Sequence, residues 1–219
     1  MAELIAPAAV GFAEERTTAF ADHLASVAAW TQEHTSAPGM MSGLAEARLL
    51  EALIVISGAR QVLEIGTFTG VGTLAMAAAL SEGGRVTTLE VDPDTAATAR
   101  GHFDASPHAG RIELIVGNAL ETVAGLDGPF DLVYIDAWKT DYPNYYEAVL
   151  PKLSPRGIIV GDNLFRGGTT LDPSVDDEAT AGMREFARRV QADDRVHNVL
   201  LTIGDGVMLV WHRPDSARR

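Results

Sequence analysis

The fold is decided by FDLVYID (residues 130–136) and GIIVGDN (residues 157–163), two apolar runs that each end in oxygen-bearing side chains. Short Val- and Ile-rich runs bounded by polar or turn residues are typical of buried parallel strands. If these two strands are neighbours, about 4.8 Å apart, then Asp136, Asp162 and Asn163 meet at the carboxyl edge of one sheet, where open α/β folds bind ligands. Two carboxylates and an amide oxygen at one point favour a hard divalent cation, above all Mg²⁺. The alternative is that each acid only caps the helix that follows it.

Outward from these runs, strand-like and helix-like stretches alternate. Such alternation predicts a parallel sheet with helices on both faces. The last two strands are separated only by Gly204-Asp205-Gly206, which predicts a hairpin that adds one antiparallel strand. The class is therefore α/β, with seven predicted strands: Gln61–Ile65, Arg85–Glu90, Ile112–Val116, Leu132–Ile135, Ile158–Val160, Val199–Ile203 and Val207–Trp211.

The N-terminal part has a different pattern. An alanine-rich, helix-favouring stretch runs from Phe12 to His34, and a second helical pattern runs from Leu44 to Ile56 after a loop signal at residues 36–39. No linker or repeat interrupts the chain. We therefore expect a single domain over residues 1–219, with residues 1–57 as an N-terminal helical lid or dimer segment and residues 58–212 as the core.

Composition narrows the class of function. The chain has 219 residues, a net charge of −13 and no cysteine, so disulfide and thiolate chemistry are excluded. So acidic a protein repels phosphate backbones and anionic membrane surfaces, which disfavours nucleic-acid and membrane partners. No apolar stretch approaches the roughly 20 residues of a membrane span, and the N-terminus lacks a signal-peptide pattern. We expect a soluble cytoplasmic protein.

A glycine-rich turn, LEIGTFTGVG (residues 63–72), follows the first predicted strand. Its glycines do not have the G-x-G-x-x-G spacing of a dinucleotide site, and Glu64 would repel a pyrophosphate but suits a ligand with an ammonium group. Glu90, at the tip of the second strand, is the acid expected to bind the ribose hydroxyls. Together these residues predict a nucleoside with a cationic amino-acid tail, which is S-adenosylmethionine. The alternative for the glycines is an ordinary tight turn.

Three motifs in this order resemble the cation-dependent small-molecule O-methyltransferases, which include caffeoyl-CoA and catechol O-methyltransferases and bacterial relatives. They are EIGTFTG (residues 64–70), IDAWK (residues 135–139) and GDN (residues 161–163), and the resemblance covers roughly residues 36–212. It implies a Rossmann-like fold, S-adenosylmethionine as donor, Mg²⁺ or another divalent cation, and a homodimer.

The same resemblance implies a set of site residues. Metal ligands are expected at Asp136, Asp162 and Asn163. One departure is Gly72, which stands where relatives often place a serine for the donor's carboxylate, so Thr73 or a backbone amide must serve. Donor contacts are expected at Met41, Ser42, Glu64, Gly66, Thr67, Gly70, Gly72, Thr73, Glu90, Ala119, Asp136 and Trp138.

Methyl transfer to oxygen needs a deprotonated or polarised hydroxyl, and a divalent cation can provide this. Lys139, one of only two lysines in the chain, lies beside Asp136 and is the expected base; the alternative is a solvated surface lysine. Together with Asp136 it forms the predicted catalytic pair. Trp138, Phe165 and Arg166, with Lys139, are the predicted substrate contacts, although Trp138 could equally pack on the donor or fill space at a boundary.

Chelation by two adjacent oxygens favours a vicinal, catechol-like hydroxyl of a small molecule in secondary metabolism as the acceptor. Three alternatives keep the donor: a hydroxyacyl group on a carrier protein, a modified tRNA base, or a donor-binding protein without catalysis. A nicotinamide dehydrogenase is a further alternative, which the glycine spacing disfavours.

Overall fold

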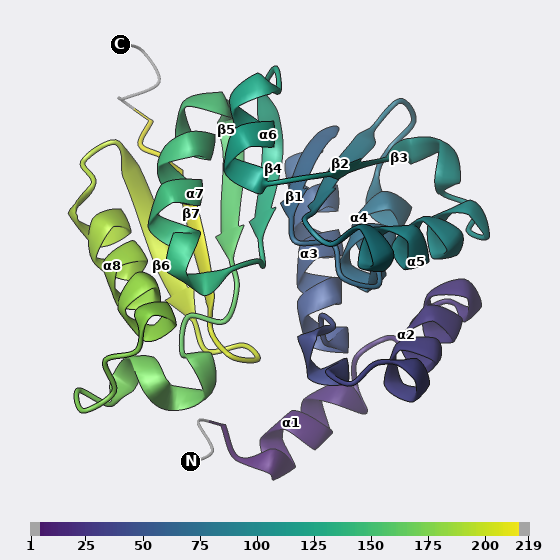
Figure 1. Cartoon of the computed structure of the whole chain (residues 1–219), viewed down its shortest axis with the longest axis horizontal. Coiled ribbons are helices and arrows are strands. Elements are labelled where there is room, and N and C mark those ends of the chain that lie inside the picture. The colour runs from purple at the N-terminus through teal and green to yellow at the C-terminus, as the bar shows by residue number, and fades with distance from the viewer. Residues whose placement is uncertain (1–4, 215–219) are drawn as a thin grey trace.

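All seven strands form one sheet in the order β3-β2-β1-β4-β5-β7-β6. The structure is a computed structural model that describes residues 5–214 (Figure 1). Strands β1 to β5 pair in parallel in this order, and β7 runs antiparallel to both of its neighbours, β5 and β6. The predicted fold class and the terminal hairpin are thereby confirmed. The strands are β1 (Gln61–Ile65), β2 (Arg85–Glu90), β3 (Ile112–Val116), β4 (Phe130–Ile135), β5 (Leu153–Gly161), β6 (Val196–Leu201) and β7 (Val207–His212).

Helices cover both faces of the sheet (Figure 1). Helices α6, α7 and α8 pack on one face, while α3 and α4 pack on the other, with α5 and α2 beside α4. Among the described residues, no helix is long and apolar enough to cross a membrane. The helices are α1 (Pro7–Glu14), α2 (Asp22–His34), α3 (Leu44–Ser57), α4 (Val71–Ala79), α5 (Pro93–Asp104), α6 (Ala119–Gly125), α7 (Tyr142–Val149) and α8 (Glu178–Ala192).

Several helices begin at a polar cap that follows a strand. The Asp92 side chain accepts a hydrogen bond from the Thr95 amide and Pro93 occupies the first turn of α5, while Asn118 caps α6 and Asp177 caps α8 in the same way. These side chains satisfy backbone donors that have no partner within the helix. The caps therefore fix where each helix leaves the sheet edge.

The N-terminal stretch from Phe12 to His34 is not one helix. It contains the end of α1 and all of α2, separated by residues 15–21. Arg48 of α3 donates to the carbonyl oxygens of Thr18 (2.9 Å) and Ala19 (2.5 Å). These contacts tie the segment between α1 and α2 to α3, and tertiary contacts of this kind can outweigh local helix propensity.

The sheet register places the expected site residues at one edge. Glu64, Tyr134 and Val160 lie in register across β1, β4 and β5, and Ile135 pairs with Gly161. Side chains alternate between the faces of a strand, so Glu64, Tyr134 and Val160 share the face covered by α3. Asp136 and Asp162 follow on β4 and β5 at the carboxyl edge above them.

Candidate active site

The carboxyl ends of β4 and β5 bring Asp136 and Asp162 side by side. The Asp162 amide donates to the Ile135 carbonyl oxygen (3.0 Å), and the Asp136 amide donates to that of Ile65 (2.9 Å), so the ladder continues to the ends of the strands. The predicted adjacency of β4 and β5 is confirmed. We call Asp136, Lys139, Asp162 and Asn163 the acid edge.

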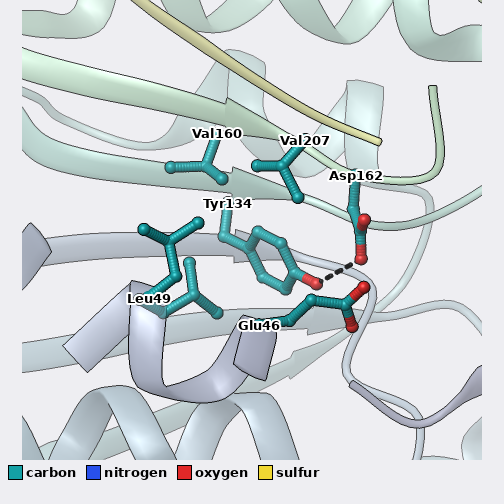
Figure 2. A pocket seen from close by; sticks show the side chains of 7 residues that line it. Glu46, Leu49, Tyr134, Val160, Asp162 and Val207 are labelled. Carbon is teal, nitrogen blue, oxygen red and sulfur yellow. Dashed lines mark hydrogen bonds between the residues drawn. The ribbon is translucent and has the colours of Figure 1, made fainter. Parts of the chain in front are cut away.

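Asp162 is buried, with 2% of its surface exposed. Its Oδ1 accepts a hydrogen bond from the Asn163 amide (2.6 Å), and its Oδ2 accepts one from the Tyr134 hydroxyl (2.9 Å; Figure 2). Burial raises the pKa of Asp162 well above its usual value, and the negative charges of Asp136 and Glu46 raise it further. This carboxylate therefore lies in surroundings that lack enough positive charge.

Lys139 is bound on the same edge and is not a freely solvated lysine. Its Nζ donates to Asp136 Oδ1 (2.7 Å) and to the Tyr142 hydroxyl (3.0 Å), and only 20% of its side chain is exposed. The Tyr142 hydroxyl in turn donates to the Ile135 carbonyl oxygen (2.9 Å). Tyr142 is fully buried in the core, so this contact fixes the ammonium relative to β4.

The glycine-rich turn after β1, which we call the donor turn (residues 64–72), lies against the end of β4. Gly66 has φ +101°, and a Cβ on it would lie 2.1 Å from the Asp136 carbonyl oxygen. Only glycine allows so close an approach of the two backbones. The turn is therefore held directly against the acid edge.

Glu64 is the buried acid of the donor turn. It is 1% exposed, and its Oε2 accepts hydrogen bonds from the hydroxyls of Thr73 and Thr88, the latter at 2.6 Å. Thr67, another expected donor contact, is buried and bonds to Thr88 (2.6 Å). Burial outweighs these bonds and raises the pKa of Glu64 to about 8. An ammonium group beside it would stabilise the ionised form.

Ser42 and Glu64 face the same small space over Gly72. A Cβ on Gly72 would lie 2.9 Å from Glu64 Oε1 and 3.1 Å from Ser42 Oγ. Thr73, the possible substitute for a serine at this position, has its hydroxyl bound to Glu64. Met41, beside Ser42, packs on the cluster of α2, α4 and α5. Gly72 thus keeps open the space that the expected donor group would enter.

Glu90 already accepts three backbone hydrogen bonds. Its Oε2 accepts from Phe68 (2.9 Å), and its Oε1 accepts from Val91 (2.9 Å) and Asp92 (3.1 Å). These bonds fix the carboxylate at the end of β2, and each oxygen has two acceptor positions, so Oε2 keeps one for a ligand. Two further expected donor contacts lie near this end of the sheet: Gly70, before α4, and Ala119, the first residue of α6.

Besides Lys139, the three other expected substrate residues differ in where the structure places them. Trp138 follows β4 and is 74% exposed, so it fills no space inside the protein. The Phe165 ring packs on Gly206 of the β6–β7 turn. Arg166 donates to Asp177 (3.1 Å) and Thr180 (2.8 Å) at the start of α8, so its guanidinium holds the loop to that helix.

Residues 5–214 contain no group of three or more His, Cys, Asp or Glu side chains that could hold a metal ion. The expected ligand set has only two carboxylates, and its third member is the amide of Asn163. Asn163 has φ +58°, a left-handed conformation that Asn tolerates better than most residues. The Asn163 side-chain oxygen would therefore be the third protein ligand of a cation held by Asp136 and Asp162.

Three residues that sequence reasoning did not assign to the site lie at it. Tyr134 and Tyr142 bind Asp162 and Lys139 through their hydroxyls. Glu46, at the start of α3, accepts from the Gly43 amide (2.9 Å), and Figure 2 shows its carboxylate near Asp162 and the Tyr134 hydroxyl. The sequence offered one signal for this arrangement. Tyr134 lies in a predicted buried strand, and a buried tyrosine hydroxyl needs a hydrogen-bond partner.

Comparison with known proteins gives one family. The family model described as O-methyltransferase matches residues 14–213. The catechol O-methyltransferase of Niastella koreensis is 34% identical over 160 residues, covering 71% of this chain and 72% of that protein.

Two solved structures, both with S-adenosylhomocysteine (SAH), share the fold. The O-methyltransferase of Bacillus cereus in complex with SAH is 30% identical, with a TM-score of 0.86 over 94% of this chain and 97% of that one. The SAH-bound methyltransferase PaMTH1 of Podospora anserina is 26% identical, with a TM-score of 0.88 over 97% of both chains.

Proposed function

The chain belongs to the O-methyltransferase family, and we propose that it transfers the methyl group of S-adenosylmethionine to a small-molecule hydroxyl with the help of a divalent cation. One observation carries the proposal. The donor turn and the acid edge adjoin along β1, β4 and β5, with Gly66 packed against the Asp136 backbone. A methyl donor and an acceptor oxygen held at these two places would lie next to each other, as an in-line displacement requires.

The donor turn suits a ligand with an ammonium group. Within residues 5–214, Glu64 is buried with hydroxyl partners only, and its raised pKa of about 8 reflects the cost of a carboxylate without a cation. Ser42 Oγ lies on the other side of the Gly72 space and can bond to the same ligand. Glu90 Oε2 keeps an acceptor position for a ribose hydroxyl. The S-adenosylhomocysteine bound in two related structures, which is the donor without its methyl group, is consistent with this assignment.

The acid edge fits a hard divalent cation. Burial and the negative charges of Asp136 and Glu46 raise the pKa of Asp162, and Lys139, whose Nζ lies 2.7 Å from Asp136 Oδ1, is the nearby positive partner. Asp136, Asp162 and the Asn163 side chain would hold the cation, since all three offer the oxygen ligands that Mg²⁺ prefers. A bound cation supplies Lewis-acid polarisation of the acceptor hydroxyl and fixes two neighbouring acceptor oxygens.

Lys139 is proposed to act as the base in its neutral form: once its ammonium has released a proton to solvent, its Nζ takes the proton of the acceptor hydroxyl. The Tyr142 hydroxyl and Asp136 Oδ1 hold this nitrogen at the edge from two sides. Trp138 follows Asp136 and is largely exposed, which suits an indole that covers a flat aromatic acceptor. Phe165 is proposed as a wall of the acceptor space, while Arg166 supports that wall through α8.

The N-terminal segment is proposed to cover the donor. Thr31 of α2 donates to Thr69 of the donor turn (2.8 Å), and Ser42 is buried beside Gly72. Ala47 and Leu50 of α3 are buried in the core, so α3 would act as the fixed base of this cover. The single domain over residues 1–219, the homodimer and the cytoplasmic location stay predictions.

A panel of matched acceptors tests the proposal. Catechol has two vicinal hydroxyls, resorcinol has the same two hydroxyls one carbon further apart, and phenol has one. With S-adenosylmethionine and Mg²⁺, we expect methylation of catechol-type acceptors and little turnover of the other two, because only vicinal oxygens chelate one cation. Equal rates on catechol and resorcinol would contradict the proposal of a vicinal acceptor. Activity found only with carrier-bound hydroxy acids or with tRNA would favour that alternative acceptor.

A further inference from the structure

Tyr134 carries a buried hydroxyl that the proposed chemistry does not use. Tyr134 and Asp162 are each 2% exposed, and the tyrosine hydroxyl donates to Asp162 Oδ2 at 2.9 Å. Figure 2 shows the ring pointing along the pocket with its oxygen directed at that carboxylate. The contact links β4 to β5 directly beneath the acid edge.

The ring cannot easily turn away from Asp162. Leu49 of α3, Val160 of β5 and Val207 of β7 line the pocket around it (Figure 2). Tyr134 also lies in register between Glu64 and Val160 in the sheet. A side chain packed on several sides keeps one rotamer, so the direction of the O–H group is fixed by the core.

Both oxygens of Asp162 are thereby restrained from the protein side. Oδ1 accepts from the Asn163 amide at 2.6 Å and Oδ2 from Tyr134. Two donors from different elements set the rotation of the carboxylate plane. Each oxygen retains an acceptor position, because a carboxylate oxygen has two lone-pair sites. The carboxylate is therefore held in one orientation, while each of its oxygens can still bind a further ligand.

The same hydroxyl lies near the donor side of the site. Ser42 Oγ is 3.4 Å from the Tyr134 oxygen, a long contact, and Ser42 also faces the space over Gly72. Tyr134 thus stands between the segment proposed to cover the donor and the carboxylate proposed to bind the cation.

We propose that Tyr134 is a positioning residue whose hydroxyl fixes the Asp162 carboxylate in the orientation that binds a divalent cation. The inference rests on the proposed function, since it takes Asp162 as a metal ligand. Groups that orient a ligand in this way typically change metal affinity by about 10- to 100-fold when they are removed. Tyr134 acts through Asp162 and does not touch the acceptor.

Tyr134→Phe tests this inference, because it removes one oxygen and keeps the ring. Mn²⁺ binding to the whole protein is measured by electron paramagnetic resonance, and S-adenosylmethionine binding by calorimetry. We expect Mn²⁺ affinity to fall about 10-fold or more while donor affinity changes less than about 3-fold. The Mg²⁺ concentration for half-maximal activity should rise by the same factor as the Mn²⁺ dissociation constant, with kcat largely recovered at saturating Mg²⁺.

Tyr146→Phe is the matched control. Tyr146 is also buried and its hydroxyl also donates to a carboxylate, Asp193 Oδ2 at 2.8 Å, but that acid follows the end of α8. Tyr146→Phe therefore shows what the loss of a buried hydroxyl away from the acid edge does. We expect its Mn²⁺ affinity to match that of the wild type. Equal Mn²⁺ affinities in wild type, Tyr134→Phe and Tyr146→Phe would overturn the proposed role of Tyr134 but not the metal site. A wild-type protein that binds no Mn²⁺ would overturn both the metal site and the role of Tyr134.

Discussion

The donor turn and the acid edge each hold carboxylates out of water, but with different partners. At the donor turn, the side-chain partners of Glu64 in the described part of the chain are the hydroxyls of two threonines. At the acid edge, Asp136 has an ammonium group, and Asp162 has a hydroxyl and a backbone amide. Buried charge is costly unless it is paired. The two regions therefore call for different ligands: one positive group over Glu64, and a cation of higher charge between the two aspartates.

The largest expected effect is on the acid edge, from Lys139→Ala. We expect kcat to fall by about 10³-fold, as for other general bases, while donor affinity changes little because Lys139 contacts Asp136 and Tyr142 and not the donor turn. The measurement is single-turnover methylation with calorimetry of donor binding. Lys152→Ala, at the only other lysine, removes a side chain that donates to the Ala124 and Leu126 carbonyl oxygens and should leave kcat unchanged. A Lys139→Ala protein of normal rate would end the base proposal.

The second effect is a pH dependence of stability at the donor turn. The pKa of Glu64 is about 8 in the folded protein and near 4.5 in the unfolded chain, so between these values the folded state binds the extra proton and stability falls as pH rises. From pH 6 to pH 8, the free energy of unfolding of the ligand-free wild type should drop by about 2 kcal/mol relative to Glu64→Gln. Denaturant unfolding at several pH values measures the difference. Parallel curves for the two proteins would show that Glu64 is ionised throughout.

The third prediction uses the same substitution, Glu64→Gln, to test whether donor binding and metal binding depend on separate groups. Glu64→Gln keeps the shape of the side chain but removes the charge proposed to pair with the donor's ammonium. Donor affinity should fall by about 10- to 100-fold, the worth of one hydrogen bond to a charged group, while Mn²⁺ affinity stays near the wild-type value. Glu113→Gln, at a half-exposed acid on β3, is the control. A loss of metal affinity in Glu64→Gln would show that the regions do not act separately.

Sequence patterns predicted the strands best where turn residues bound them closely. The bounds of β1, β2 and β3 agree with the prediction. The prediction for β5 began at Ile158, but the strand begins at Leu153, which still pairs with Phe130 of β4 although Pro155 and Gly157 follow. The prediction of one helical stretch over residues 12–34 was wrong: the chain leaves the helix between α1 and α2, where Arg48 from a helix remote in sequence binds two carbonyl oxygens.

Within the site, the charged residues near the strand ends could be predicted, whereas Glu46 of α3 and the hydroxyl groups that orient the carboxylates could not. Acidic side chains at strand ends or directly after apolar runs suggest a functional role. For this reason the sequence singles out Asp136, Asp162 and Glu64. Tyr134 and Tyr142 sit in patterns that periodicity assigns to the core, and both do pack there. Their hydroxyl partners depend on strand register and on side-chain direction, which a single sequence does not specify.

The most direct test of the account is the dependence of methyl transfer on a divalent cation. The protein is chelated exhaustively, and methylation of a catechol-type acceptor is followed while Mg²⁺ is added back, with Asp162→Ala in parallel. We predict that chelation abolishes wild-type turnover, that Mg²⁺ restores it, and that Asp162→Ala stays inactive although it binds the donor. Full activity of the chelated wild type would contradict the claim that the carboxylates at the ends of β4 and β5 act through a bound cation.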